Sequence, residues 1–312
     1  MIRLSLIICT HNPRLEYLNR VFESLKAQTL PRDEWELLLI DNRSDRPLSE
    51  TVDLSWHPAG RHIREEELGL TPARLRGIRE AGSELLLFVD DDNCLKGDYL
   101  EICVMKMENN ALLGTLGAGK IMPEYEVQPP PDTLPFVKML ALRNDLIPHF
   151  SNAISFNKAI PYGAGLCIRK SFALDYLESC RSRPFSSSLG RNGAALLSGE
   201  DVDMALHACK ANYLAGVIPE LEIIHIIPRG RLDPDYLVRI AFGHAYSHFL
   251  LGKVWGYHSD YAENPLLKNL RYYKKVLRIS GLSRRIYVAE QKAIRDARAA
   301  WSKLGSPVAL AG

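Results

Sequence analysis

The sequence predicts an α/β protein, with a doubly wound, mostly parallel sheet flanked by helices and a helical C-terminal extension. Short apolar runs alternate with segments of helical periodicity through the first third of the chain, which is typical of parallel strands joined by crossover helices. These runs end in polar, mostly acidic residues, as strands do where a ligand binds at their carboxyl ends. With 312 residues, of which 46% are hydrophobic, the chain is long enough to bury a core.

Each element of the first part is justified by its own pattern. Leu4–Thr10 is an apolar run stopped by a His-Asn-Pro turn, as expected for a buried parallel strand. Between residues 15 and 28 the apolar residues recur at helical spacing, and Thr71 followed by Pro72 is a typical helix start. We therefore expect strands at 4–10, 35–40 and 85–89, and helices at 15–28, 71–81 and 99–109.

The second part is less regular. Residues 162–168 read as a glycine turn entering a strand, and residues 182–198, rich in Ser, Gly and Asn, are expected to form a mobile loop. Residues 202–210 have helical spacing with acidic residues just before them, and residues 221–227 are apolar around a single histidine. These segments predict two further strands and one further helix.

Composition and charge exclude several classes of protein. With 39 basic and 37 acidic side chains the net charge is +2, so no overall field favours nucleic acid as a partner. The six cysteines are scattered without a C-x-x-C spacing, which argues against a zinc cage or a disulfide framework and suits a reducing cytoplasm. The N-terminus has no signal-peptide pattern, and the uncharged stretch Ile240–Gly252, at 13 residues, is too short to cross a bilayer. We expect a soluble, cytoplasmic protein.

The sharpest motif is the triplet Asp90-Asp91-Asp92, directly after the strand expected at 85–89. Three adjacent carboxylates repel one another, and a hard divalent cation relieves that repulsion. Mg²⁺ or Mn²⁺ held by one or two carboxylates keeps positions open for substrate phosphates. The triplet therefore predicts a Mg²⁺ or Mn²⁺ site, with a solvated acidic turn as the alternative.

Two further features bear on this site. Glu200 and Asp201 open the helix expected at 202–210, where a carboxylate that faces a metal-bound substrate could act as a general base. A helix N-terminus that simply favours acidic residues is the alternative. His225 lies in an apolar segment and is either a core histidine or, if the acidic cluster lies near it, a metal ligand.

Two glycine-rich segments do not carry a nucleotide-binding motif of their own. Gly114–Lys120 nearly forms a P-loop, but Ile121 replaces the required hydroxyl residue and Pro123 prevents the following helix, so an ATPase or GTPase is excluded. The Tyr162–Gly165 turn lacks the third glycine of a dinucleotide fingerprint. No nucleophilic cysteine and no Ser-His-Asp order is indicated.

Five segments carry a family resemblance, and they are Leu6–Asn12, Ile40–Asp45, Gly69–Gly77, Phe88–Asn93 and Gly199–Asp201. In this order they resemble the motifs of family-2 glycosyltransferases of the GT-A fold. The resemblance covers about residues 1–230 and does not extend to the tail. It implies a catalytic domain over 1–230, with a nucleotide-binding half to about residue 125 and an acceptor half over 126–230, followed by a helical basic extension over 231–312.

The resemblance also implies roles for individual residues. Asp201, with Glu200 beside it, matches the general base of inverting members. Asp90 and Asp92 resemble the D-x-D pair, with Asp92 as the direct metal ligand, and His225 resembles a late histidine that completes the metal site. The nucleotide-sugar is expected to contact the following residues: Thr10, Asn12, Asp41, Asn42, Arg74, Asp90, Asp91 and Gly165.

The implied reaction agrees with the chemistry of the residues. A sugar nucleotide leaves as a diphosphate whose developing charge needs a cation, and Asp201 would accept the proton of the attacking hydroxyl. We therefore predict an inverting glycosyltransferase that uses a nucleotide-diphospho-sugar, with UDP as the expected nucleotide and Mn²⁺ or Mg²⁺ as cofactor. A nucleotidyltransferase on a similar fold is one alternative, although residues 11–14 lack the Gly- and Arg-rich loop that it needs. A non-catalytic scaffold that binds sugar nucleotides is the other.

The C-terminal tail is strongly basic. Residues 266–303 contain eleven Lys or Arg and only two acidic residues, interspersed with tyrosines. This composition suits an anionic membrane surface or a lipid-diphosphate acceptor, and hence peripheral contact with the inner face of the cytoplasmic membrane. A solvated helix pair packed on the catalytic domain, or a dimer contact, is the alternative. An acceptor saccharide on a polyprenyl carrier or in a growing surface polysaccharide fits either case.

Overall fold

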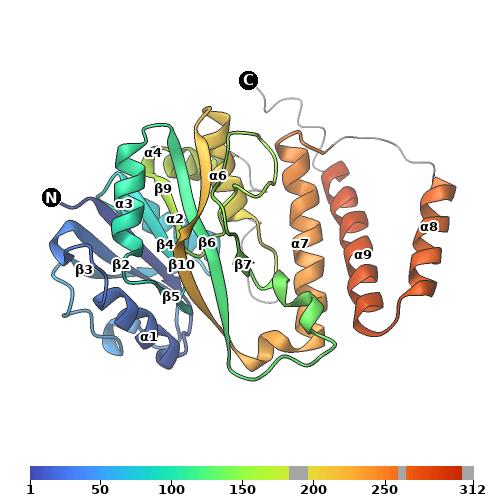
Figure 1. Ribbon diagram of the computed structural model, residues 1–312, viewed down its shortest axis with the longest axis horizontal. Coiled ribbons are helices and arrows are strands. Elements are labelled where there is room, and N and C mark those ends of the chain that lie inside the picture. Colours follow the sequence, from blue (N-terminus) through green and yellow to red (C-terminus); the bar gives the residue numbers. More distant parts are fainter. Residues whose placement is uncertain (183–195, 259–264, 304–312) are drawn as a thin grey trace.

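The first four strands form the parallel part of one large sheet (Figure 1). They are β1 (Leu4–Thr10), β2 (Trp35–Asn42), β3 (Gly60–Glu65) and β4 (Leu85–Val89), and they lie in the order β3-β2-β1-β4. The computed structural model describes residues 1–182, 196–258 and 265–303. Most of the loop predicted at 182–198 therefore lies outside the described residues.

The three strands predicted in this part are confirmed. β1, β2 and β4 are apolar runs whose residues are almost all buried, as strands covered on both faces must be. β3 was not predicted from the sequence. It is an edge strand in which Ile63 alone is fully buried, so it has no apolar run to mark it.

The second part of the sheet is mixed. β9 pairs antiparallel with both β4 and β6, whereas β10 runs parallel to β6 and antiparallel to β5. The P-loop-like segment 114–120 lies inside β6 as a mostly buried strand, so it forms no phosphate-binding loop. The strands of this part are β5 (Asn93–Leu95), β6 (Leu113–Tyr125), β7 (Arg143–Asn144), β8 (His149–Ser151), β9 (Leu166–Arg169) and β10 (Leu214–Ile227).

Helices cover both faces of the sheet, and this confirms the α/β fold class. The helices are α1 (Leu15–Lys26), α2 (Leu70–Glu80), α3 (Tyr99–Asn109), α4 (Lys170–Ser182) and α6 (Glu200–Lys210). Because strand residues alternate between faces, Leu6 and Ile8 of β1 pack with α1 and α3, and Ile7 between them packs with α2, α4 and α6. The helices expected at 15–28, 71–81, 99–109 and 202–210 are all present with small shifts at their ends.

The described part of the C-terminal region contains α7 (Pro234–Val254), α8 (Pro265–Arg278) and α9 (Gly281–Lys303). Asp233 caps α7 by accepting a hydrogen bond from the Asp235 amide, and Pro234 takes the first helical position. α7 and α9 pack on each other through an apolar cluster that includes Leu237 and Ile286, and α8 lies outermost (Figure 1). Among the described residues, no helix is both long enough and apolar enough to span a membrane.

Candidate active site

The strands β1, β2 and β4 end at one edge of the sheet, and a cavity of about 940 Å³ opens there. Several more segments contribute to its wall, among them the start of α2, residues 138–141, the turn at 162–164, the start of α6 and one face of α7. Nine of the twelve residues predicted for the site line this cavity, namely Thr10, Asn42, Arg74, Asp90, Asp91, Asp92, Glu200, Asp201 and His225. The fold thus brings residues of all five sequence motifs to one place.

The carboxylates of the acidic triplet lie in different surroundings. Asp90 faces the cavity with 39% of its side chain exposed. Asp91 accepts a hydrogen bond from the Thr10 hydroxyl. Burial, and after it the negative charge of Asp92, raise the pKa of Asp91 to about 7. Burial and the neighbouring carboxylate thus oppose the ionisation of Asp91, and a cation bound nearby would favour it.

Asp92 contacts His225 and an arginine that was not predicted from the sequence. Asp92 Oδ1 lies 3.7 Å from His225 Nε2, and Asp92 Oδ2 lies 2.7 Å from Nη2 of Arg231. The other terminal nitrogen of Arg231, Nη1, lies 2.9 Å from the same Nε2 of His225. His225 is therefore at the acidic cluster. Arg231 follows β10 in a 3-10 turn, and only its neighbours in space distinguish it from the arginines around it.

The donor atoms fit a divalent cation that is held in part by the substrate. Asp92 offers carboxylate oxygen and His225 offers imidazole nitrogen, a set that suits Mn²⁺. Within residues 1–182, 196–258 and 265–303, no three His, Cys, Asp or Glu side chains are grouped so as to hold a metal ion. A cation at Asp92 would therefore also need oxygen ligands from water or from a diphosphate.

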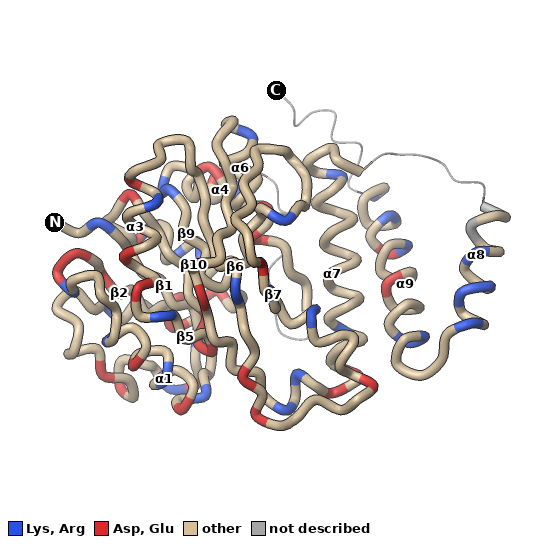
Figure 2. The backbone as a smooth tube through the Cα atoms, in the orientation of Figure 1, with Lys and Arg blue, Asp and Glu red and all other residues tan. Residues whose placement is uncertain are grey.

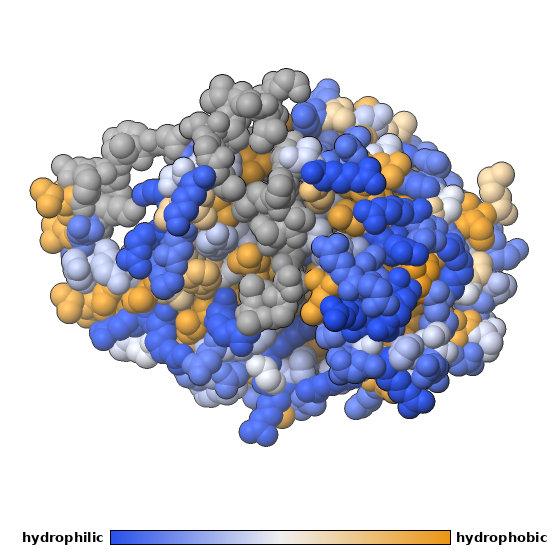
Figure 3. Space-filling view, turned by 180° about the vertical axis from the view of Figure 1, so that it is seen from behind, coloured by the Kyte–Doolittle hydropathy of each residue, from blue (hydrophilic) through white to orange (hydrophobic). Residues whose placement is uncertain are grey.

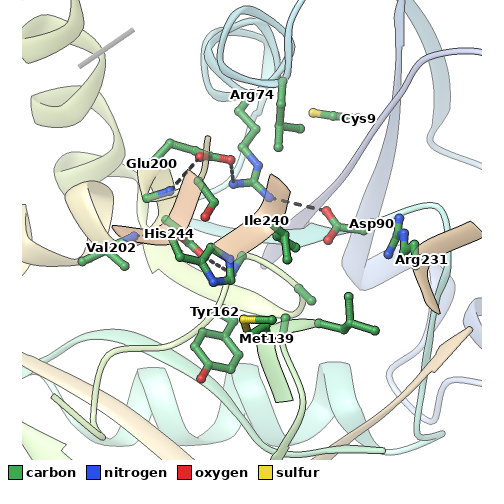
Figure 4. A pocket seen from close by; sticks show the side chains of 18 of the residues that line it. Cys9, Arg74, Asp90, Met139, Tyr162, Glu200, Val202, Arg231, Ile240 and His244 are labelled. Carbon is green, nitrogen blue, oxygen red and sulfur yellow. Dashed lines mark hydrogen bonds and ion pairs between the residues drawn. The ribbon is translucent and has the colours of Figure 1, made fainter. Parts of the chain in front are cut away.

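A buried ion pair joins three elements at the cavity. Arg74 of α2 is 3% exposed, and its Nη1 lies 2.9 Å from Glu200 Oε1 while its Nη2 lies 3.4 Å from Asp90 Oδ1 (Figure 4). Gly163 packs directly on the guanidinium, because a Cβ atom there would lie 2.5 Å from Arg74 Nη2. A side chain at position 163 would therefore displace the guanidinium from its present contacts with the two carboxylates.

Two backbone amides fix the carboxylate of Asp201 at the cavity wall. Oδ2 accepts a hydrogen bond of 2.7 Å from the Gly163 amide, and Oδ1 accepts one of 2.8 Å from the Val202 amide. Each carboxylate oxygen has a second acceptor site, which can take the proton of a hydroxyl group. Glu200 is instead held by Arg74. Of the two carboxylates predicted to be catalytic, Asp201 is the better placed to act as a base.

Two of the predicted donor-binding residues, Asn12 and Gly165, are not among those that line the cavity. Asn12 has a φ of 48° and ties the end of β1 to the loop after β2, since its side chain bonds both the amide and the carboxylate of Asp45. The carbonyl of Gly165 accepts a hydrogen bond from the Tyr99 hydroxyl. Both residues have structural roles here, and their contact with a nucleotide stays a prediction.

Asp41 also lies outside the cavity lining. Its carboxylate accepts hydrogen bonds from the amides of Ser44 and Leu48 and lies 2.8 Å from Arg64. Burial by itself raises the pKa of Asp41, but the bonds from Ser44 and these other partners outweigh it, so that the pKa is lowered. Asp41 thus organises the loop after β2, and its contact with the base or ribose stays a prediction.

Sequence reasoning missed the part of the cavity formed by the C-terminal region. Ile240, His244 and His248 of α7 line the cavity together with Glu290 of α9. Figure 4 shows Ile240 and His244 near Tyr162. The α7 sequence reads as a buried core helix, and nothing in its spacing marks one face as a cavity wall. The boundary at residue 230 between the catalytic domain and the C-terminal extension stays a proposal. α7, which lies beyond this boundary, nevertheless forms part of the cavity wall.

Comparison with known proteins identifies the fold and the family. The sequence matches the family described as glycosyl transferase family 2 over residues 5–164, just over half of the chain. A crystal structure of S. aureus TarS with UDP-GlcNAc is 16% identical, with 84% of this chain and 68% of that chain covered and a TM-score of 0.52. The mannosyltransferase PcManGT from Pyrobaculum calidifontis, with GDP-Man and Mn²⁺, is 18% identical, with coverages of 99% and 76% and a TM-score of 0.55. Among curated proteins no match was found.

Proposed function

The chain belongs to glycosyl transferase family 2 and is a glycosyltransferase, and from this premise we propose that it is an inverting, metal-assisted enzyme. The proposed donor is a nucleotide-diphospho-sugar, with UDP as the nucleotide. The proposed acceptor is a hydroxyl group of a saccharide or a lipid-linked saccharide, as in the synthesis of cell-envelope polysaccharides. One observation carries the proposal: the acidic triplet and Asp201, far apart in sequence, line the same cavity.

In the proposed reaction, the acceptor oxygen attacks the anomeric carbon from the face opposite the diphosphate. Asp201 accepts the hydroxyl proton at a carboxylate oxygen. As the new carbon–oxygen bond forms, the bond between the anomeric carbon and the diphosphate oxygen breaks, and its electron pair leaves with the nucleoside diphosphate. A single displacement inverts the anomeric configuration. A cation bound at Asp92 and His225 would supply charge stabilisation to the leaving diphosphate.

No covalent enzyme intermediate is needed in this reaction. Cys9 also lines the cavity, but burial raises the pKa of its thiol to about 12, so the thiol stays protonated at neutral pH and is a poor nucleophile. The nucleotidyltransferase alternative lacks support from the loop after β1, which is short and glycine-free. The non-catalytic scaffold alternative differs from our proposal in requiring no base at position 201.

Calorimetric titration of the purified protein with UDP, GDP and dTDP, each with and without Mn²⁺, tests the donor site. We expect one nucleotide to bind at least about tenfold more tightly with Mn²⁺, because a cation held at Asp92 would attract the negatively charged diphosphate. Asp92→Asn should remove this metal effect, whereas the control Asp53→Asn, in an exposed loop, should keep it. If the folded protein binds none of the three nucleotides, the donor site is wrong.

We also propose that α8 attaches the enzyme to an anionic membrane. Four apolar side chains recur at helical spacing on one exposed stripe of this helix, and they are Leu266, Leu270, Tyr273 and Leu277. Basic residues flank the stripe, as the charge colouring of α8 in Figure 2 shows. On its other side α8 contacts α9, where Lys275 lies over the ring of Tyr287. Apolar residues are visible at the left edge of Figure 3, over this outermost helix.

An exposed apolar stripe between cationic side chains is the pattern of a helix that lies in a membrane interface. The charge of the tail selects an anionic bilayer, and the proposed location is the inner face of the cytoplasmic membrane, where a lipid-linked acceptor would be present. A partner protein or a second copy of the chain is the alternative occupant of the stripe.

Vesicle sedimentation tests the membrane contact. The variant Leu270→Glu/Leu277→Glu places two charges in the stripe, and we expect its binding to phosphatidylglycerol vesicles to fall at least about tenfold. Leu146→Glu is a matched control, because Leu146 and Leu277 are both 80% exposed but Leu146 lies outside α8. Equal binding of all three proteins, or equal binding of the wild type to neutral vesicles, would rule out this contact.

A further inference from the structure

Arg231 lies between two side chains that the proposed cation would need. Its Nη2 lies 2.7 Å from Asp92 Oδ2, and its Nη1 lies 2.9 Å from His225 Nε2. The side chains of Asp92 and His225 are only 7% and 6% exposed, so water competes little for these contacts. One guanidinium thus pairs with two of the three predicted metal ligands, whereas the third, Asp90, pairs with Arg74.

These contacts fix the protonation pattern of His225. Every nitrogen of a guanidinium group is a donor and none is an acceptor, so Nε2 of His225 must accept the hydrogen bond from Arg231. Its lone pair therefore points toward the guanidinium. The same lone pair is the one that an imidazole uses to bind a metal ion. Nδ1 is buried and finds no hydrogen-bond partner in the described part of the chain, so no hydrogen bond at that nitrogen sets the orientation of the ring.

We propose that the Arg231 guanidinium occupies the cation site in the metal-free protein and holds the side chains of Asp92 and His225 in place. A divalent ion must displace it from His225 in order to bind. Without metal, the guanidinium neutralises Asp92 and holds His225 with its lone pair toward the site. With metal, Nε2 of His225 passes from the guanidinium to the ion, because its single lone pair cannot serve both, whereas the carboxylate of Asp92 has further acceptor sites and can contact the ion and Arg231 together. Arg231 also lines the cavity, so the released side chain stays where a diphosphate would bind. The inference rests on the proposed function for both the divalent ion and the diphosphate.

The proposal predicts that Arg231 weakens metal binding by the free enzyme. In a titration with Mn²⁺ and no nucleotide, followed by the electron paramagnetic resonance signal of the free ion, we expect Arg231→Gln to bind Mn²⁺ about tenfold or more tightly than the wild type. Adding Asp92→Asn to this variant should abolish the gain, which places the ion at this site. Arg231→Lys should give an intermediate affinity, because an ammonium group has no planar fork with which to reach both partners.

Arg229→Gln is the matched control. Arg229 lies in the same turn, is exposed, and carries the same charge as Arg231. Its substitution therefore tests whether the loss of any nearby positive charge is enough to raise the affinity for Mn²⁺. Unchanged or weaker Mn²⁺ binding in both Arg231→Gln and Arg231→Lys would overturn the proposal, as would an equal gain in Arg229→Gln. Because no nucleotide is present, this outcome is independent of the calorimetric test of the donor site.

Discussion

Asp201→Asn is expected to lower turnover by about 10²- to 10⁴-fold while donor binding stays within a few-fold of the wild type. The amide of Asn cannot take up a proton from the acceptor, so the attacking oxygen loses its base. The side chain is held at the cavity wall by the Gly163 amide and is not among the residues that are proposed to bind the donor. Turnover would be measured as release of nucleoside diphosphate from the donor sugar whose nucleotide binds in calorimetry.

A structural effect of this substitution has to be separated from a chemical one. Asp203, two residues further along α6, is fully buried and accepts a hydrogen bond of 2.8 Å from Trp255 Nε1, but it does not line the cavity. Asp203→Asn should therefore lower stability without changing the turnover of the folded protein more than about twofold. If Asp201→Asn keeps full turnover, the assignment of the base is wrong and the scaffold alternative gains support.

Arg74→Met should lower the free energy of unfolding by about 3–5 kcal/mol. Arg74 and Glu200 have side chains that are only 4% and 5% exposed, and the guanidinium pairs with the buried carboxylate at 2.9 Å. Methionine fills much of the volume but leaves the negative charge of Glu200 close to that of Asp90. Urea denaturation followed by circular dichroism would measure the loss.

A double-mutant cycle tests whether charge is the cause. Glu200→Gln removes the negative charge that Arg74 pairs with, so the variant Arg74→Met/Glu200→Gln should recover most of the stability that Arg74→Met loses. If the free energy of unfolding falls equally in Arg74→Met and in the double variant, packing around position 74 and not the ion pair stabilises this region. A loss below about 1 kcal/mol for Arg74→Met would contradict the account of the buried pair.

The elements that could be predicted are those whose burial leaves a periodic pattern. β1, β2 and β4 are buried on both faces and appear as apolar runs, and α3 was predicted with its observed ends. β3 and β5 were missed, because an edge strand with one buried residue and a strand of three residues leave no such pattern. The mixed pairing of the second part depends on contacts between distant segments, which periodicity does not report.

Some residues of the candidate site could likewise be predicted from the sequence, and others could not. Residues at strand ends and at the start of α6 could be predicted, since the carboxyl ends of parallel strands meet at one edge. Arg231 could not, because its contacts with Asp92 and His225 arise only when the turn after β10 folds back on the triplet. His244 and His248 could not either, since the way α7 packs decides which of its faces meets the cavity.

The central claim is that the cavity at the strand ends performs an inverting glycosyl transfer. Its most direct test is proton NMR of the sugar released when the wild-type enzyme, with Mn²⁺, slowly hydrolyses the α-linked donor sugar whose nucleotide binds in calorimetry. Water then takes the place of the acceptor, and the configuration is read before the free sugar equilibrates. The account predicts that the β-anomer forms first and that Asp201→Asn suppresses it. Initial release of the α-anomer, or release that is unaffected by this substitution, would contradict it.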